Sequence, residues 1–78
     1  FEEAVRLWKK AAKKRHIYAH IELAKFYEHR ERDVKRGLKW TISARSEVER
    51  ADLPAFVRKH WLHEIERRLA RLERKDGI

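Results

Sequence analysis

The chain contains no cysteine, one proline and two glycines among its 78 residues. No disulfide can therefore stabilise the fold, and few residues are present that would interrupt a helix. No apolar run approaches the roughly 20 residues that a membrane span requires, and no signal-peptide core is present. These absences predict one small, soluble, helix-rich domain that is not embedded in a membrane. The lack of cysteine agrees with a cytoplasmic location.

Groups for catalysis and metal binding are also scarce. No nucleophile, base and orienting group occur together, so we expect no enzymatic activity and no cofactor. His16 and His20 are four residues apart, and His60, His63 and Glu64 fall within one helical turn, which are spacings that allow side chains to share a zinc ion. Neither group has further ligands at a recognisable spacing. We therefore predict no metal site.

Positive charge is the most distinctive feature that is present. The chain has 21 Lys and Arg residues against 13 Asp and Glu residues, which gives a net charge of +8. Residues 1–15 carry half of this excess. Such a charge favours an anionic partner, which could be nucleic acid, an acidic protein surface or a phospholipid surface.

Apolar spacing predicts four helices, over residues 1–14, 16–30, 34–50 and 54–75. Asp33 is placed to cap the third helix, and Asp52 is placed to cap the last one, which begins at Pro54. Gly77 suits a left-handed residue after the last helix. The junction at residues 14–16 lacks Gly and Pro, so one continuous bent helix over residues 1–30 remains an alternative. Gly37, inside the third helix, predicts that another backbone passes close to it.

An internal repeat relates two of these helices. Residues 3–11 match residues 36–44 in their order of small, apolar, basic and large side chains, at an offset of 33 residues. A period of this length predicts stacked helix pairs. The run from Ile21 to Tyr27, with Gly37 and Ala44 at two small positions of the following helix, resembles the tetratricopeptide repeat and the related Sel1-like repeat.

This resemblance implies an all-α fold in which antiparallel helix hairpins stack as a short right-handed solenoid. Residues 1–14 would be the second helix of a preceding repeat, residues 16–50 one full repeat, and residues 54–75 a long capping helix. We expect residues 1–78 to be one domain and a fragment of a longer chain. Residues 19–29, Trp40 and residues 66–75 also resemble the helical C-terminal region attached to some bacterial proteins with an RNase H-like exonuclease domain. Because no acidic nuclease motif is present, no catalytic role is implied.

The repeat resemblance also implies a surface that binds a partner. The positions of the first helix that face the concave side of such repeats are Tyr18, Ile21, Lys25, Glu28 and His29. The expected function is a non-catalytic scaffold that binds another protein or another domain of the parent chain. Alternatively, the long last helix or a preceding helix covers part of this face.

A basic cluster predicts a second kind of partner. Its members are Lys9, Lys10, Lys13, Lys14 and Arg15. Such a cluster binds nucleic acid by releasing counterions, and the alternative function is a nucleic-acid-binding accessory of a nuclease-type parent protein. Trp8 could provide base stacking, but it lies on the apolar stripe of its helix, so we expect it in the core.

The last helix carries an apolar stripe with the spacing of a coiled-coil seam, formed by Leu62, Ile65, Leu69 and Leu72. Only about two heptads are present, fewer than an independent coiled coil needs. We therefore expect this stripe to pack across the preceding helix pair. Self-association through the exposed end of the helix is the alternative.

Overall fold

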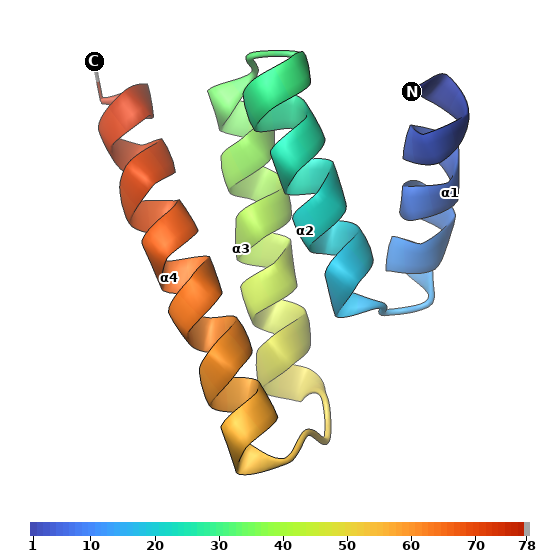
Figure 1. Ribbon diagram of the computed structural model, residues 1–78, viewed down its shortest axis with the longest axis vertical. Coiled ribbons are helices and arrows are strands. Elements are labelled where there is room, and N and C mark those ends of the chain that lie inside the picture. The colour runs from blue at the N-terminus through green and yellow to red at the C-terminus, as the bar shows by residue number, and fades with distance from the viewer. Residues whose placement is uncertain (78) are drawn as a thin grey trace.

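The computed structural model describes residues 1–77, which form four α-helices and no β-strand. The helices are α1 (Glu2–Lys13), α2 (Ile17–Lys25), α3 (Val34–Arg50) and α4 (Ala55–Asp76), and a π-helical turn, η1 (Phe26–Arg30), continues α2. Consecutive helices run antiparallel and follow one another across the molecule in chain order (Figure 1). The array is flattened, with extents of 35 × 30 × 13 Å. The all-α prediction is confirmed.

Helices α2 and α3 form the central hairpin, and they approach each other closely at Gly37. A Cβ atom at this residue would lie 3.5 Å from the carbonyl oxygen of Ala24 and 3.6 Å from the backbone nitrogen of Glu28. The Thr41 hydroxyl, which is buried in the same region, donates a hydrogen bond of 2.7 Å to the Gly37 carbonyl. The predicted close approach of a second backbone is thus confirmed.

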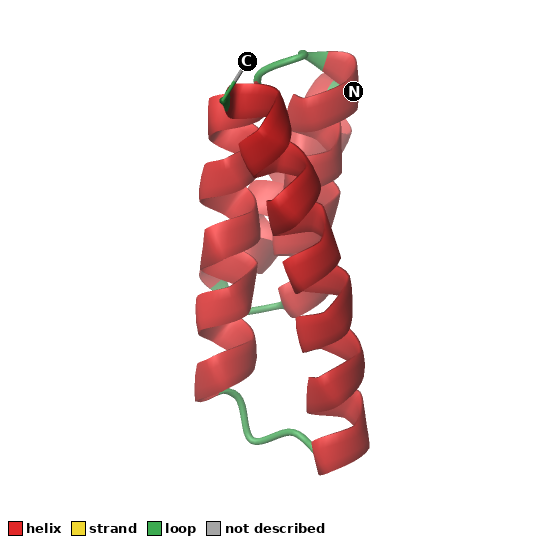
Figure 2. Ribbon diagram, turned by 90° about the vertical axis from the view of Figure 1, so that its left-hand side faces the viewer, coloured by secondary structure: helices red, strands yellow, loops and turns green. Residues whose placement is uncertain are grey.

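Two apolar clusters hold the other helices against this hairpin. One cluster joins α2, α3 and α4, and its buried residues are Ile21, Ala44, Val48, Ile65 and Leu69. The other joins α1 to α2 through Ala12, Ala19, Leu23 and Tyr27, with Val5, Trp8 and Trp40 packed against them. Figure 2 shows α4 running alongside α3, joined to it by a loop at one end. The stripe on α4 therefore packs within the chain, and Trp8 lies against the core, as expected.

The junction between α1 and α2 is a sharp turn, so the alternative of one bent helix is wrong. The backbone nitrogen of Arg15 donates to the Ala12 carbonyl at 2.9 Å, and that of His16 donates to the Ala11 carbonyl at 3.1 Å. This is the Schellman pattern of helix termination, in which the first residue beyond the cap adopts a left-handed conformation. Arg15 holds that conformation, with φ of 64°. A sequence search for Gly misses this turn, because the left-handed residue is an arginine.

The caps at the N-terminal ends of α3 and α4 agree only in part with those predicted from the sequence. The Asp33 carboxylate accepts a hydrogen bond of 3.1 Å from the backbone nitrogen of Arg36, which confirms the predicted cap of α3. The predicted cap from Asp52 is wrong, because Pro54 precedes the first residue of α4 and no side chain caps that end.

The C-terminal ends of α3 and α4 are formed in different ways. At the end of α3, the Arg58 guanidinium donates to the carbonyls of Val48 at 3.2 Å and Ala51 at 2.9 Å. Because Arg58 comes from α4, it joins the two helices as well as capping one of them. At the end of α4, the predicted left-handed cap is wrong, since Gly77 has φ of −77°. The last residue of the expected domain, Ile78, lies outside the described residues.

None of the helices formed by residues 1–77 combines the length and the apolar character needed to cross a lipid bilayer.

Candidate functional site

Of the five residues predicted to line one partner-binding face, α4 covers two and leaves three exposed. Tyr18 is 53% exposed, and Lys25 and His29 are also exposed. Ile21 is only 9% exposed, in the apolar cluster shared with α4, and Glu28 is 4% exposed. The expectation of one continuous open face is thus corrected, because α4 covers Ile21 and Glu28. Coverage by the last helix was the alternative that the sequence left open.

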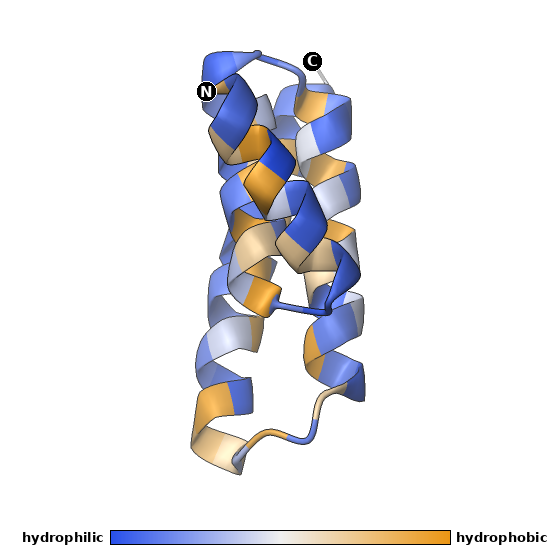
Figure 3. Cartoon of the chain, turned by 90° about the vertical axis from the view of Figure 1, so that its right-hand side faces the viewer, coloured by the Kyte–Doolittle hydropathy of each residue, from blue (hydrophilic) through white to orange (hydrophobic). Residues whose placement is uncertain are grey.

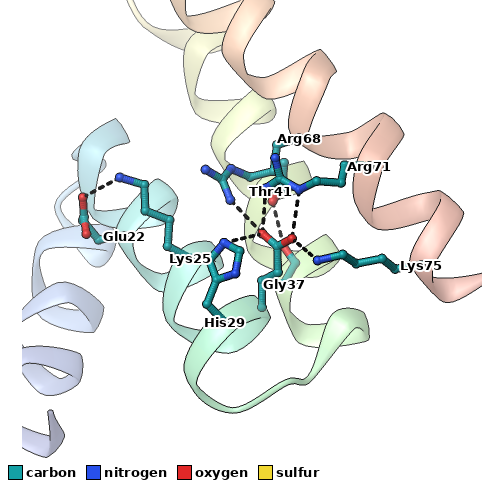
Figure 4. A network of polar contacts seen from close by, with 9 residues as sticks. Glu22, Lys25, His29, Gly37, Thr41, Arg68, Arg71 and Lys75 are labelled. Atoms are coloured by element: carbon teal, nitrogen blue, oxygen red, sulfur yellow. Dashed lines mark hydrogen bonds and ion pairs between the residues drawn. The ribbon is translucent and has the colours of Figure 1, made fainter.

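Glu28 is the centre of an ion-pair network that connects η1 to α4. Its Oε1 atom accepts hydrogen bonds from Arg68 at 2.9 Å and from Arg71 at 2.8 Å. Its Oε2 atom accepts from Arg71 Nε at 3.0 Å and from Lys75 at 2.8 Å, and His29 Nε2 lies 3.2 Å from Oε1 (Figure 4). The carboxylate is therefore satisfied within the chain, and its role is to hold α4 against the hairpin.

The environment of Glu28 favours its charged form. Burial by itself raises the pKa of this carboxyl. Hydrogen bonds from Arg71 and Lys75, together with the positive charge of Arg71, outweigh burial and lower the pKa to about 2 from an ordinary value of 4.5. Burial lowers the pKa of the Arg68 guanidinium, which is 14% exposed, while the charge of Glu28 opposes that effect. The network is thus a structural contact that depends on an ionised Glu28.

A groove between α1 and the α2–η1 segment brings together two of the predicted partner-binding residues and several aromatic rings. The volume of the groove is about 390 Å³. We call it the aromatic groove, and its lining residues are Phe1, Trp8, Glu22, Lys25, Phe26, His29 and Arg30. Lys25 and His29 were predicted from the sequence, whereas the aromatic lining was not. The aromatic residues belong to separate helices, so their spacing in the sequence does not indicate a shared groove. They meet only because α1 packs beside α2.

The aromatic rings in this groove lie close together. The ring centroid of Phe26 lies 5.9 Å from that of Phe1 and 6.4 Å from that of Trp8. The Arg30 guanidinium lies 4.4 Å from the Phe1 centroid, within the range of a cation–π contact. Lys25, which also lines the groove, pairs with Glu22 at 3.3 Å. The groove thus combines aromatic rings with polar residues that include two cations, Lys25 and Arg30, and one carboxylate, Glu22.

The basic cluster at the end of α1 remains open to solvent. All five of its residues are exposed, and none of them forms a side-chain ion pair with another residue of the described part of the chain. Seen from the α1 side, the last turn of this helix and the turn after it are mainly hydrophilic (Figure 3). Because no neighbouring carboxylate neutralises these charges, the cluster creates a local positive potential that attracts anions.

A hollow of about 310 Å³ lies beside this cluster, between α1 and α3. We call it the His20 hollow, and its lining residues are Lys9, Ala12, Lys13, His20 and Trp40. His20 is 4% exposed, and neither of its ring nitrogens has a hydrogen-bond partner among residues 1–77. Burial lowers its pKa below the ordinary value of 6.5, and the charge of Glu47 and the nearby Ala12 carbonyl oppose that shift, although the Ala12 carbonyl does not meet the geometry of a hydrogen bond. The ring is therefore neutral at pH 7.

The histidine pairs considered as metal ligands do not form a site. Within residues 1–77, no three His, Asp or Glu side chains lie close enough together to hold a metal ion. His16 is exposed beside Tyr18, with ring centroids 5.7 Å apart, whereas His20 is buried.

Comparisons of the chain with protein-family models, with curated proteins and with solved structures find no match. The surfaces described above are therefore the basis for assigning a function.

Proposed function

We propose that this chain is a non-catalytic helical module, similar to a tetratricopeptide repeat, that binds a segment of another protein or of another domain. The observation that carries the proposal is the aromatic groove, which three aromatic rings line together with Glu22, Lys25, His29 and Arg30. The 33-residue period and the α2–α3 hairpin with a helix on each side are compatible with a repeat array.

The chemistry of the groove specifies the kind of segment that fits. Closely spaced aromatic rings provide an apolar contact surface, and such rings contribute strongly to protein interfaces. The two cations Lys25 and Arg30 outnumber the single carboxylate Glu22, so the groove favours acidic residues on either side of the inserted side chain. The proposed ligand is therefore a segment with one large apolar residue flanked by Asp or Glu.

Selection from a displayed library of 12-residue peptides tests this proposal. We expect enrichment of a large apolar residue flanked by Asp or Glu. The variant Lys25→Glu/His29→Glu should bind the selected peptides at least about tenfold more weakly, because it reverses the net charge of the groove. The matched control is Lys59→Glu/Arg67→Glu, which changes two exposed residues of α4. Equal binding by both variants, or no enriched acidic peptide, would contradict the proposal.

Binding of nucleic acid is a second candidate function, and the unpaired basic cluster favours it. Five exposed cations occur within seven residues and lack counter-charges among residues 1–77. Arg15 adds a separate argument. A non-glycine residue in the left-handed region costs roughly 1 kcal/mol, which glycine would avoid. Arginine at this position therefore lowers the stability of the fold but adds an unpaired positive charge to the cluster, which favours a role for that charge in binding.

Two variants test the second candidate with a fluorescent single-stranded decathymidylate at about 50 mM salt. We expect Lys10→Glu/Lys14→Glu to weaken binding at least about tenfold and to reduce the salt dependence, because fewer phosphates are neutralised. Arg15→Gly should raise the melting temperature while it weakens binding several-fold, and a more stable variant cannot lose binding through misfolding. The charge reversal at Lys59 and Arg67 is again the control. If these variants bind decathymidylate as tightly as the wild-type chain does, this function is excluded.

A further inference from the structure

The His20 hollow contains a polar group that the fold leaves unused. Buried polar atoms in folded proteins nearly always have a hydrogen-bond partner. His20 is an exception, because its Nδ1 and Nε2 atoms are both buried and both lack a partner in residues 1–77. A neutral imidazole offers one N–H donor and one acceptor nitrogen. The imidazole that lines the hollow therefore has hydrogen-bonding capacity that the fold leaves unused.

The other lining residues supply further features of a binding site. The Trp40 ring forms one wall, with its centroid 5.6 Å from that of His20, and it is only partly buried. Lys9 and Lys13 lie on the α1 side, and both are exposed members of the unpaired basic cluster. An aromatic wall, an imidazole with unpartnered nitrogens and two cations thus meet in one place, contributed by three helices.

We propose that the His20 hollow receives one base of a single-stranded nucleic acid, an inference that rests on the second candidate function above. The base stacks against Trp40, and its edge pairs with one ring nitrogen of His20. Lys9 and Lys13 neutralise the phosphates on either side. Stacking of this kind accepts any base, because every base has a flat aromatic face.

The size and the charge of the hollow agree with this ligand. Its volume of about 310 Å³ is at the lower end of the range for small-molecule sites, roughly 300–1,000 Å³, and suits one ring system. The imidazole nitrogens of His20 are buried, so pairing with a base requires the ring or the side chains around it to move. An acidic peptide would use the cations but has no flat ring for Trp40 and no need of the acceptor nitrogen. The combination therefore favours a base over a carboxylate.

The test compares two ligands of equal charge, a fluorescent decathymidylate and an abasic decamer with the same sugar-phosphate backbone. We expect the wild-type chain to bind the decathymidylate roughly tenfold more tightly than the abasic decamer. His20→Leu should reduce decathymidylate binding to the level of the abasic decamer and leave abasic binding unchanged. Its melting temperature should be equal to or higher than that of the wild type, because the substitution removes an unpaired buried polar group.

A measurement on the wild-type chain keeps the test independent of how the variant folds. The NMR signals of the Trp40 indole and the His20 imidazole should shift when decathymidylate is added and stay in place when the abasic decamer is added. Equal binding of both oligomers by the wild type would overturn the inference about the hollow while leaving the second candidate function intact. If neither oligomer binds at about 50 mM salt, both are wrong. If a glutamate-rich decapeptide, but no oligomer, binds and shifts these signals, the hollow is a peptide site and the inference is also overturned.

Discussion

We expect Glu28→Gln to lower the free energy of unfolding by about 3 kcal/mol, which is a large part of the stability of a 78-residue domain. The substitution removes the charge on which Arg68, Arg71 and Lys75 converge. Arg68 is 14% exposed, so it would lose its counter-charge without gaining full hydration. The melting temperature should fall by at least about 12 °C in a thermal denaturation experiment.

The matched control is Glu22→Gln, which removes another ion-paired carboxylate of the same hairpin. Glu22 is 38% exposed and pairs with Lys25 only one helical turn away. Exposed pairs of this kind contribute little, so we expect a change below about 0.5 kcal/mol. Equal effects of the two substitutions would show that the Glu28 network does not hold α4 in place.

Acid denaturation provides a second measurement of the same contact. The pKa of Glu28 is about 2 in the folded chain, against an ordinary value of 4.5. The unfolded chain therefore takes up a proton first as the pH falls, so the stabilisation is fully present above pH 4.5 and is lost between pH 4.5 and about 2. The loss amounts to about 2 to 3 kcal/mol, reduced from the full shift because Arg71 and Lys75 are 41% and 45% exposed. In Glu28→Gln this part of the pH dependence should be absent.

We expect Ile65→Ala to reduce the free energy of unfolding by about 3 to 4 kcal/mol. Ile65 has no exposed surface, and it lies where side chains of α2, α3 and α4 meet, beside Ile21 and Val48. Truncation of this side chain leaves a cavity whose walls belong to three helices. The cavity can be closed only if all three helices move. Urea denaturation should show the loss as a lower midpoint with an unchanged slope.

Leu62→Ala is the control for this prediction, because Leu62 belongs to the same stripe but is only partly buried. Its effect should be clearly smaller, at about 1 to 2 kcal/mol. The midpoint of the wild-type chain should also be independent of protein concentration, since the stripe packs within one molecule. A midpoint that rises with concentration would favour self-association through α4.

The local features of this fold could be read from the sequence. The apolar period identified four helices, and Asp33 marked the start of α3 through a hydrogen bond to a residue three positions away. Gly37 indicated where α2 and α3 come into contact. Each of these signals depends on neighbours within about one helical turn, which is why composition and spacing were sufficient.

Two turns show where local signals failed. The left-handed turn at Arg15 lacks the glycine that usually marks it, and the π-helical turn of η1 has no composition that distinguishes it from an α-helix. Both conformations are maintained by hydrogen bonds to residues five positions away, such as that from His16 to Ala11 and that from Glu31 to Phe26. Nothing in the residue types alone separates these patterns from ordinary helix.

The candidate sites depend on tertiary structure. Charge and spacing identified the basic cluster, because its five residues are consecutive or nearly so. The role of Glu28 depends on Arg68, Arg71 and Lys75, which are 40 to 47 residues away in the chain. The aromatic groove and the His20 hollow likewise form only where α1 packs against the hairpin. The sequence by itself determined which helices form and which of their faces are apolar or charged, whereas the packing of the helices decided which charged side chains are buried in ion pairs and which remain free to bind a partner.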